Sequence, residues 1–289
     1  ASDLDGDGQP NTEANGSKVS IWMDKSGNDY NAPQSMVENQ PIYLSDDGSG
    51  KPALQLGNQW FNATGVNFNA KQIFVVTKAR AVSNDHMAII SRGVDKGQLR
   101  ALSSSPKYNN TASTSFAFGS GGELRINGAV GVDFPLGTPH IVSAKLGSGS
   151  TYAGHYQNMI IGRDDHNSDR WDGNVYEVIV FDRFLNTDET RQTEWYLAQK
   201  WGIQGPIPSG SGVYAAEYGS TSAGRAFLLA KMNLREASPA EKNRALEATT
   251  PGSVTQLDPE LRIEPGGNPE KVNEFGIESL RTGTWVVPN

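Results

Sequence analysis

The 289-residue chain contains no cysteine, and this absence excludes several kinds of protein at once. A disulfide scaffold, a thiol nucleophile and a thiolate metal site all need that residue. Long hydrophobic runs are also missing, and none approaches the roughly 20 residues that a membrane-spanning helix needs. Basic charge is in deficit, because the formal net charge is −7. A nucleic-acid-binding protein normally carries a basic patch, so we expect no nucleic-acid partner and no membrane insertion.

Several common catalytic motifs are absent as well. The sequence has no G-x-S-x-G elbow, Walker loop, H-E-x-x-H motif or dinucleotide-binding glycine motif. Glycoside cleavage needs two positioned carboxyl groups. Glu177 is the only carboxylate in the clearest predicted strand, and no partner stands two or four residues away. We therefore expect a protein that is not an enzyme.

Short apolar stretches recur between residues 19 and 181, separated by turns rich in Gly, Asn, Ser and Asp. Strands at this spacing predict an all-β protein, a sandwich of two antiparallel sheets. Alternating helices, which a Rossmann or TIM architecture would show, are missing. The clearest predicted strands are residues 73–78, 87–91, 113–118, 140–144, 159–162 and 175–181.

The passage 170–203 combines the last of these strands with a helix. Residues 175–181 predict a strand with one largely apolar face. Asn186 can cap a helix over residues 187–201, with Glu189 reaching back to complete a capping box and Gly202 as the left-handed stop. Three tryptophans at these and the upstream motif positions are expected in the core: Trp22, Trp195 and Trp201.

Four sequence blocks together resemble a known family. They are V-S-I-W-M-D-K-S-G-N at 19–28, K-P-A-L-Q-L at 51–56, D-G-N-V-Y-E-V at 172–178, and the strand-to-helix passage that ends K-W-G-I at 200–203. This order is similar to that of LamG-like jelly-roll (concanavalin A-like) domains of bacterial surface proteins, over roughly residues 1–203. The resemblance implies a two-sheet jelly roll with one edge helix and an extracellular, cell-surface location.

The start of the chain departs from the pattern that the resemblance implies. Relatives carry a short strand before the first acidic loop, whereas this sequence begins at Ala1-Ser2-Asp3. We expect that first strand to be missing or to lie outside this sequence. Its neighbour would then present an open sheet edge, which is a template for a strand from elsewhere.

Beyond Gly202 the composition changes. Residues 204–212 read as a Gly/Pro/Ser linker, and residues 213–289 as a C-terminal extension. Ser238 and Glu241 form a capping box that predicts a helix to about residue 248. The extension has few apolar residues to bury, so we expect it to dock on the sandwich or on a neighbouring subunit.

Two acidic loops carry the residue types that bind calcium. The first, residues 3–13, has the D-x-D-x-D-G spacing of a calcium loop but lacks the flanking helices and the twelfth-position Glu of an EF-hand. The second crowds carboxylates before the last strand. The alternative for both is a solvated hydrophilic loop. The predicted Ca²⁺ ligands are Asp3, Asp5, Asp7, Gln9 and Asn11 in the first loop, and Asp164, Asp165 and Asp169 in the second.

Aromatic side chains in loops could form a sugar platform, because ring faces stack on pyranoses while nearby polar groups bind hydroxyls. The candidate ligand-binding residues are Trp60, Tyr108, Tyr152, His166 and Asn167.

Three functions follow from these patterns. The favoured one is a non-enzymatic structural or adhesive subunit of a bacterial cell surface, which self-assembles through strand or tail exchange and is stabilised by calcium. The exchanging strand would be residues 284–287 or the missing N-terminal one. The alternative is a calcium-dependent carbohydrate-binding module with a glycan ligand. A glycan-cleaving enzyme of the same fold is the least favoured.

Overall fold

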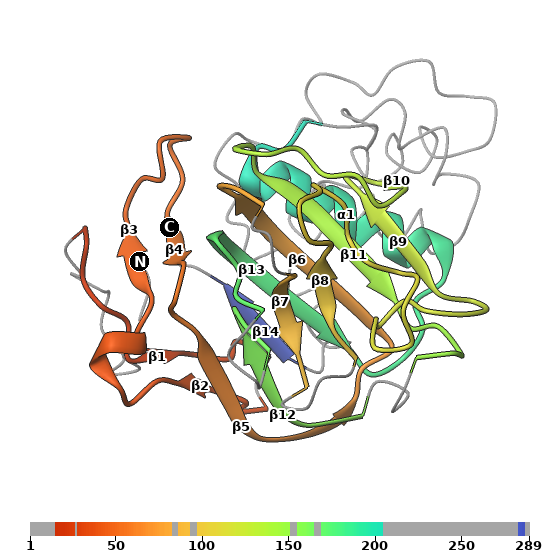
Figure 1. The fold of residues 1–289 in the computed structure, drawn as a ribbon, viewed down its shortest axis with the longest axis horizontal. Helices are drawn as coiled ribbons and strands as arrows, with labels where there is room; N and C mark the ends of the chain where they lie inside the picture. The colour runs from red at the N-terminus through yellow and green to blue at the C-terminus, as the bar shows by residue number, and fades with distance from the viewer. Residues whose placement is uncertain are drawn as a thin grey trace, which may run out of the picture.

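The computed structural model describes residues 15–26, 28–82, 86–92, 97–150, 155–164, 169–204 and, for the backbone only, 283–286. The described chain is an all-β sandwich of antiparallel sheets with a single α-helix (Figure 1). The predicted acidic loop at 3–13, the linker from residue 205 onward and the helix at 238–248 lie outside the described residues.

The large sheet holds eight strands. Its spatial order is β10 (Ala129–Val130), β9 (Glu123–Ile126), β11 (His140–Lys145), β6 (Gln72–Ala79), β13 (Gly173–Phe181), β4 (Ala53–Leu56) and β3 (Ile42–Leu44), with β14 (Gly283–Val286) beside β13.

Two smaller sheets and a short helical turn complete the sandwich. The four-stranded sheet has the order β5 (Phe61–Asn69), β12 (His155–Ile161), β7 (Met87–Ser91) and β8 (Leu99–Ala101). A two-stranded sheet pairs β1 (Ile21–Trp22) with β2 (Ala32–Pro33), and a 3₁₀ turn, η1, spans Val37–Asn39.

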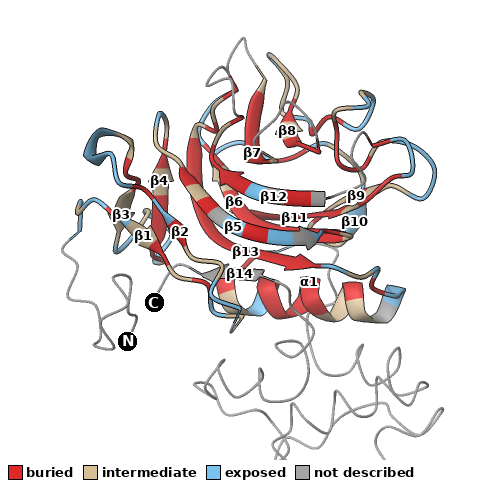
Figure 2. Ribbon diagram, turned by 90° about the horizontal axis from the view of Figure 1, so that it is seen from below, coloured by how far each residue is buried: buried red, intermediate tan, exposed pale blue. Residues whose placement is uncertain are grey.

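The central strands are buried on both faces (Figure 2). The four-stranded sheet lies on one side of the large sheet, and the helix α1 (Thr187–Trp201) lies along the other. All nine residues of β13 are buried. The sequence predicted only one apolar face for this strand, because a helix packed on its second face cannot be read from the strand itself.

A β-bulge breaks the alternation of β13. Val175 pairs with Thr77 and Glu177 with Val76, so Tyr176 is the extra residue between them. An extra residue places two successive side chains on one side of the sheet. Tyr176 and Glu177 accordingly both contact Trp201 of α1, the tyrosine ring at 5.4 Å between centroids and the carboxylate at 2.6 Å.

The helix begins and ends where the sequence predicts. The Asn186 side chain accepts from the Glu189 amide, and the Glu189 carboxylate accepts from the Asn186 amide. Gly202 ends the helix with a φ of 67°, a left-handed conformation that costs glycine little. The three expected core tryptophans, Trp22, Trp195 and Trp201, are all buried.

Five of the six clearest predicted strands are present, and one prediction is wrong. Residues 113–118 form turns rather than a strand. Their buried Phe116 accepts a hydrogen bond from the Gly147 amide, and Phe118 accepts one from Gly149. The backbone partners of this segment thus come from the loop after β11 and from Gln98, which precedes β8 and forms an isolated bridge with Ser115, and these contacts replace regular strand pairing.

Among the residues that the structure describes, no helix is both long enough and apolar enough to cross a membrane.

Candidate functional site

The loop between β12 and β13 brings two of the predicted calcium ligands together. Asp164 and Asp169 are both buried. The Asp169 amide donates to the Asp164 carboxylate at 3.2 Å, and the Asp164 amide donates to the Asp169 carbonyl at 3.0 Å. These bonds hold the two carboxylates at the base of the loop. The predicted residues between them, Asp165, His166 and Asn167, lie outside the described residues.

A cation from a distant strand already contacts this pair. Arg100 of β8 donates to the Asp169 carboxylate at 3.0 Å. Burial and the neighbouring Asp164 carboxylate raise the pKa of Asp169, and Arg100 opposes this rise. Carboxylate oxygens are ligands that Ca²⁺ prefers. Within the described residues, no group of three or more Asp, Glu or His side chains is placed to hold a metal, so calcium binding here stays a prediction.

Trp60, the first candidate for a sugar platform, lies against the same loop. It precedes β5 and is partly buried. The guanidinium carbon of Arg163 lies 3.6 Å from the centre of its indole ring, so an arginine occupies one ring face. The backbone of Arg170 pairs with that of Arg163 in an isolated β-bridge, and the Arg170 side chain donates to Asn58 at 2.5 Å. The structure therefore gathers Trp60, Asp164 and Asp169 at one rim, although they are a hundred residues apart in sequence.

The prediction that Tyr108 is a loop platform for sugar is wrong. Its side chain is buried, and its hydroxyl forms a hydrogen bond of 3.1 Å with His140 Nε2. The Tyr108 ring packs against Phe134 at 4.8 Å and Trp171 at 6.2 Å between centroids. The apolar residues that cover it come from other loops, which the local sequence does not reveal. The remaining candidate, Tyr152, lies outside the described residues.

Burial also changes the chemistry of this aromatic cluster. Desolvation lowers the pKa of His140 to about 4, against a backbone hydrogen bond to Thr138 that favours the charged form. Desolvation raises the pKa of Tyr108 well above its ordinary value. Both side chains are therefore neutral near pH 7, as a buried hydrogen-bonded pair should be.

Sequence reasoning named Glu177 only as a lone strand carboxylate and did not predict the ion pairs of three buried carboxylates on the side of the sheet that α1 covers. The first, Glu177, accepts from Trp201 at 2.6 Å and lies 3.2 Å from the Lys200 ammonium. Its other oxygen, Oε1, has no hydrogen-bond partner in the described part of the chain.

The second and third carboxylates are paired more fully. Glu194 of α1 accepts from Arg125 at 2.8 Å and from Ser143 at 2.9 Å. Asp47 accepts from Tyr176 at 2.6 Å and from Lys78 at 2.9 Å. Burial opposes ionisation of Asp47, but hydrogen bonds from Ser49, Tyr176 and Lys78 outweigh it and lower its pKa to about 2. These groups attach the helix and a loop to the sheet.

Comparisons with known proteins add no identification, because no protein-family model, curated protein or solved structure matches the chain.

Proposed function

We propose that the chain is a LamG-like jelly-roll domain that serves as a non-enzymatic structural or adhesive subunit of a bacterial cell surface and self-assembles by exchanging its C-terminal strand. Calcium bound by the acidic loops stabilises the assembly in this proposal. The observation that supports it most directly is the pairing of β14 with β13.

The slot that β14 occupies lies inside the large sheet. On the side of β13 opposite β6, β4 pairs only with residues 173–175, and β14 pairs with residues 177–180. The β13 residues in this slot are buried. Buried backbone amide and carbonyl groups need hydrogen-bond partners. A strand in this place is therefore required to complete the hydrogen bonding of β13 inside the sheet.

The strand that fills the slot is remote in sequence. Gly283 pairs with Val180, and Val286 pairs with Glu177 (blue strand in Figure 1). Strand addition depends chiefly on backbone hydrogen bonds, so an identical strand from a second copy fits the same slot in the same register. Exchange of one element between identical chains is a low-cost route to oligomers.

The cysteine-free background permits a direct test of this proposal. Ile179 and Thr284 are direct partners across the β13–β14 ladder. Two full-length variants, I179C and T284C, each carry one cysteine. They are mixed at low and high concentration, oxidised, and analysed on a non-reducing gel. We expect a covalent heterodimer, because strand exchange brings the two cysteines together and a disulfide forms only where the two Cα atoms come within about 7 Å. Its yield should rise with concentration, because exchange joins two chains.

Two controls define the outcome. In the double variant I179C/T284C at low concentration, an intramolecular disulfide reports pairing within one chain. Mixing V130C with T284C measures collisional cross-linking, because Val130 is exposed on β10 at the far edge of the sheet. If the double variant closes internally while the mixture yields no more heterodimer than this control, strand exchange is overturned. Loss of the heterodimer in excess chelator assigns calcium to the assembly.

A further inference from the structure

Phe184, in the turn between β13 and α1, is an exposed aromatic side chain that lies between two lysines. Half of its surface is exposed. The Lys71 and Lys145 ammonium groups lie 5.8 Å and 5.7 Å from its ring centre. Neither lysine forms an ion pair with a carboxylate in the described part of the chain, so both carry charge that is available to a ligand.

Hydrogen bonds join the backbone segments that carry the three side chains. The Lys71 amide donates to the Phe181 carbonyl at 2.7 Å, and the Leu146 amide donates to the Lys71 carbonyl at 2.9 Å. The buried Gln72 side chain accepts from the Leu185 amide at 3.3 Å. These bonds join the start of β6, the end of β11 and the turn after β13. The backbone that carries the ring and the two lysines is therefore fixed, so a ligand has to order only these side chains when it binds.

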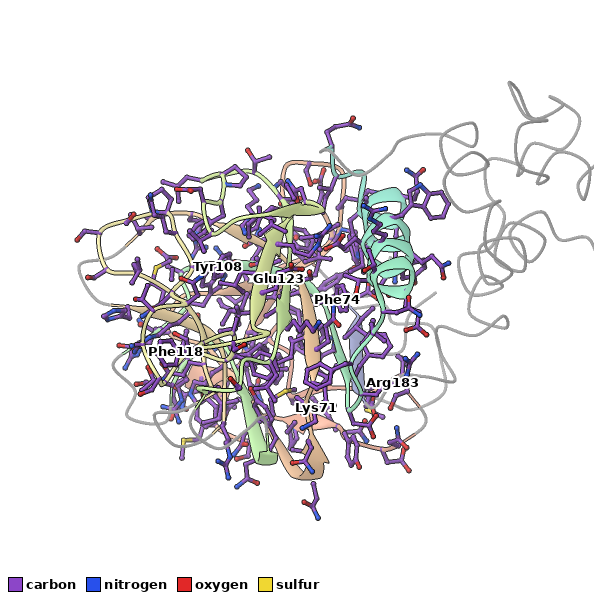
Figure 3. All side chains as sticks on the ribbon, turned by 90° about the vertical axis from the view of Figure 1, so that its right-hand side faces the viewer. Lys71, Phe74, Tyr108, Phe118, Glu123 and Arg183 are labelled. Atoms are coloured by element: carbon purple, nitrogen blue, oxygen red, sulfur yellow. The ribbon has the colours of Figure 1, made fainter. Side chains whose placement is uncertain are left out.

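Two other charged side chains in this region, Arg183 and Glu123, each have a partner of opposite charge. Arg183, which lies at the same end of the molecule as Lys71 in Figure 3, is paired with Glu189 at 2.8 Å. Glu123, directly opposite Lys145 in the β9–β11 ladder, lies 3.6 Å from Arg125. Lys71 and Lys145 therefore place two positive charges at the Phe184 ring, near Asp182, whose carboxylate acts on Arg183, in a chain whose net charge is −7.

From this arrangement we infer that Phe184, Lys71 and Lys145 form a binding site for an anionic polysaccharide, one that carries carboxylate or sulfate groups. The apolar face of a pyranose stacks on an aromatic ring. The two ammonium groups lie over the ring in the free chain, and in the complex they turn aside to bind the acidic substituents through charge-assisted hydrogen bonds, which frees a ring face for the sugar. This site is separate from the β13–β14 slot and does not depend on strand exchange.

A polysaccharide fits the site better than an anionic membrane. A membrane faces a whole side of the molecule, so the net negative charge would oppose its approach. A single sugar chain contacts only the local patch, because charges farther than about 10 Å away are screened at 0.1 M salt. One half-exposed ring also offers little area for insertion into lipid. Vesicle binding is therefore the competing outcome that the experiment must distinguish.

The test measures binding of the full chain to polygalacturonate by calorimetry at about 0.1 M salt, with dextran as the uncharged probe. We expect binding to polygalacturonate, none to dextran, and weakening as salt is raised. F184A and F184L should each weaken binding at least about fivefold, because both remove the ring, although leucine keeps the apolar area. F184W keeps an aromatic ring and should retain binding. K71Q/K145Q should weaken binding about tenfold or more, which corresponds to about 1.4 kcal/mol or more. K71R/K145R should retain binding.

Matched controls come from the opposite end of β6. The first is Leu136, an exposed apolar side chain whose neighbour Gly137 donates its amide to Ala79 at the end of β6. The second is Lys107, an exposed lysine that is paired with Asp133. L136A and K107Q should bind like the unaltered chain. Equal binding by all variants, no binding to polygalacturonate, or binding only to phosphatidylglycerol vesicles would overturn the assignment. Unchanged melting temperatures in the Phe184 variants separate lost binding from lost folding.

Discussion

The two faces of the large sheet bury their side chains in different ways. The face toward the four-stranded sheet is filled mainly by apolar residues such as Val75, Val142 and Val178. The face under α1 buries Glu177, Glu194 and Asp47, each within ion-pair distance of a lysine or arginine. Apolar contacts are non-directional, whereas a buried charge needs its partner in a defined place.

This difference assigns separate tasks to the two faces. Apolar packing on the first face favours burial without fixing one position. The charged face fixes the position of α1 along the sheet, because a shift of the helix would leave Glu194 without Arg125 and Ser143. The same pairing makes the charged face sensitive to single substitutions and to acid, and the following experiments measure that sensitivity.

Removal of the Glu194 carboxylate should have the largest effect. Glu194→Ala leaves the largely buried Arg125 without its principal partner. We expect the free energy of unfolding to fall by about 3–4 kcal/mol in urea denaturation. Asp133→Ala, which breaks the exposed Lys107–Asp133 pair, should cost less than about 1 kcal/mol.

The double variant R125M/E194L sharpens this comparison. When both charges are replaced by apolar side chains, the loss should be clearly smaller than the sum of the two single losses. A loss equal to that sum would mean that the two side chains contribute independently, and the positional role of the ion pair would be wrong.

The apolar face should respond to pH through His140. Its pKa is about 4 in the folded chain against an ordinary 6.5. Protonation therefore favours the unfolded chain, and stability should be full above pH 6.5 and fall as the pH drops toward 4. We expect a loss on the order of 2–3 kcal/mol over this window. Denaturation at a series of pH values should show this slope disappear in H140Q and persist in H86Q.

The charged face should respond in a lower and separate window through Asp47. Its folded pKa is about 2, below the ordinary 3.8, so its contribution is present above pH 4 and lost as the pH falls toward 2. We expect a loss of about 1 kcal/mol after allowance for screening by solvent. D47N should flatten the curve below pH 4 and leave the His140 window intact. A single merged transition would contradict the separation of the two faces.

Local patterns predicted much of the framework. The capping box at Asn186, the stop at Gly202 and the buried tryptophans depend on residues close in sequence, and the structure confirms them. The bulge at Tyr176 and the turns at 113–118 were not predictable in this way. Both depend on which distant backbone lies alongside, and strand propensity contains no information about that neighbour.

The predicted sites fared differently for the same reason. Asp164 and Asp169 lie close together because they close one short loop, a local property. Tyr108 is buried by Phe134 and Trp171, which lie 26 and more residues away. Phe184 is exposed although it follows a buried strand. Exposure is set by the covering segments, so a single sequence distinguishes a platform from a core ring poorly.

The position of β14 determines the order in which this sheet can be completed during synthesis. β14 emerges from the ribosome roughly 100 residues after its partner β13. At about 5–20 residues per second, this interval lasts on the order of 5–20 s. During this interval, residues 177–180 of β13 lack their strand partner, and the slot is vacant. Under the strand-exchange proposal, this interval is the time in which the last strand of a neighbouring chain can reach the slot first.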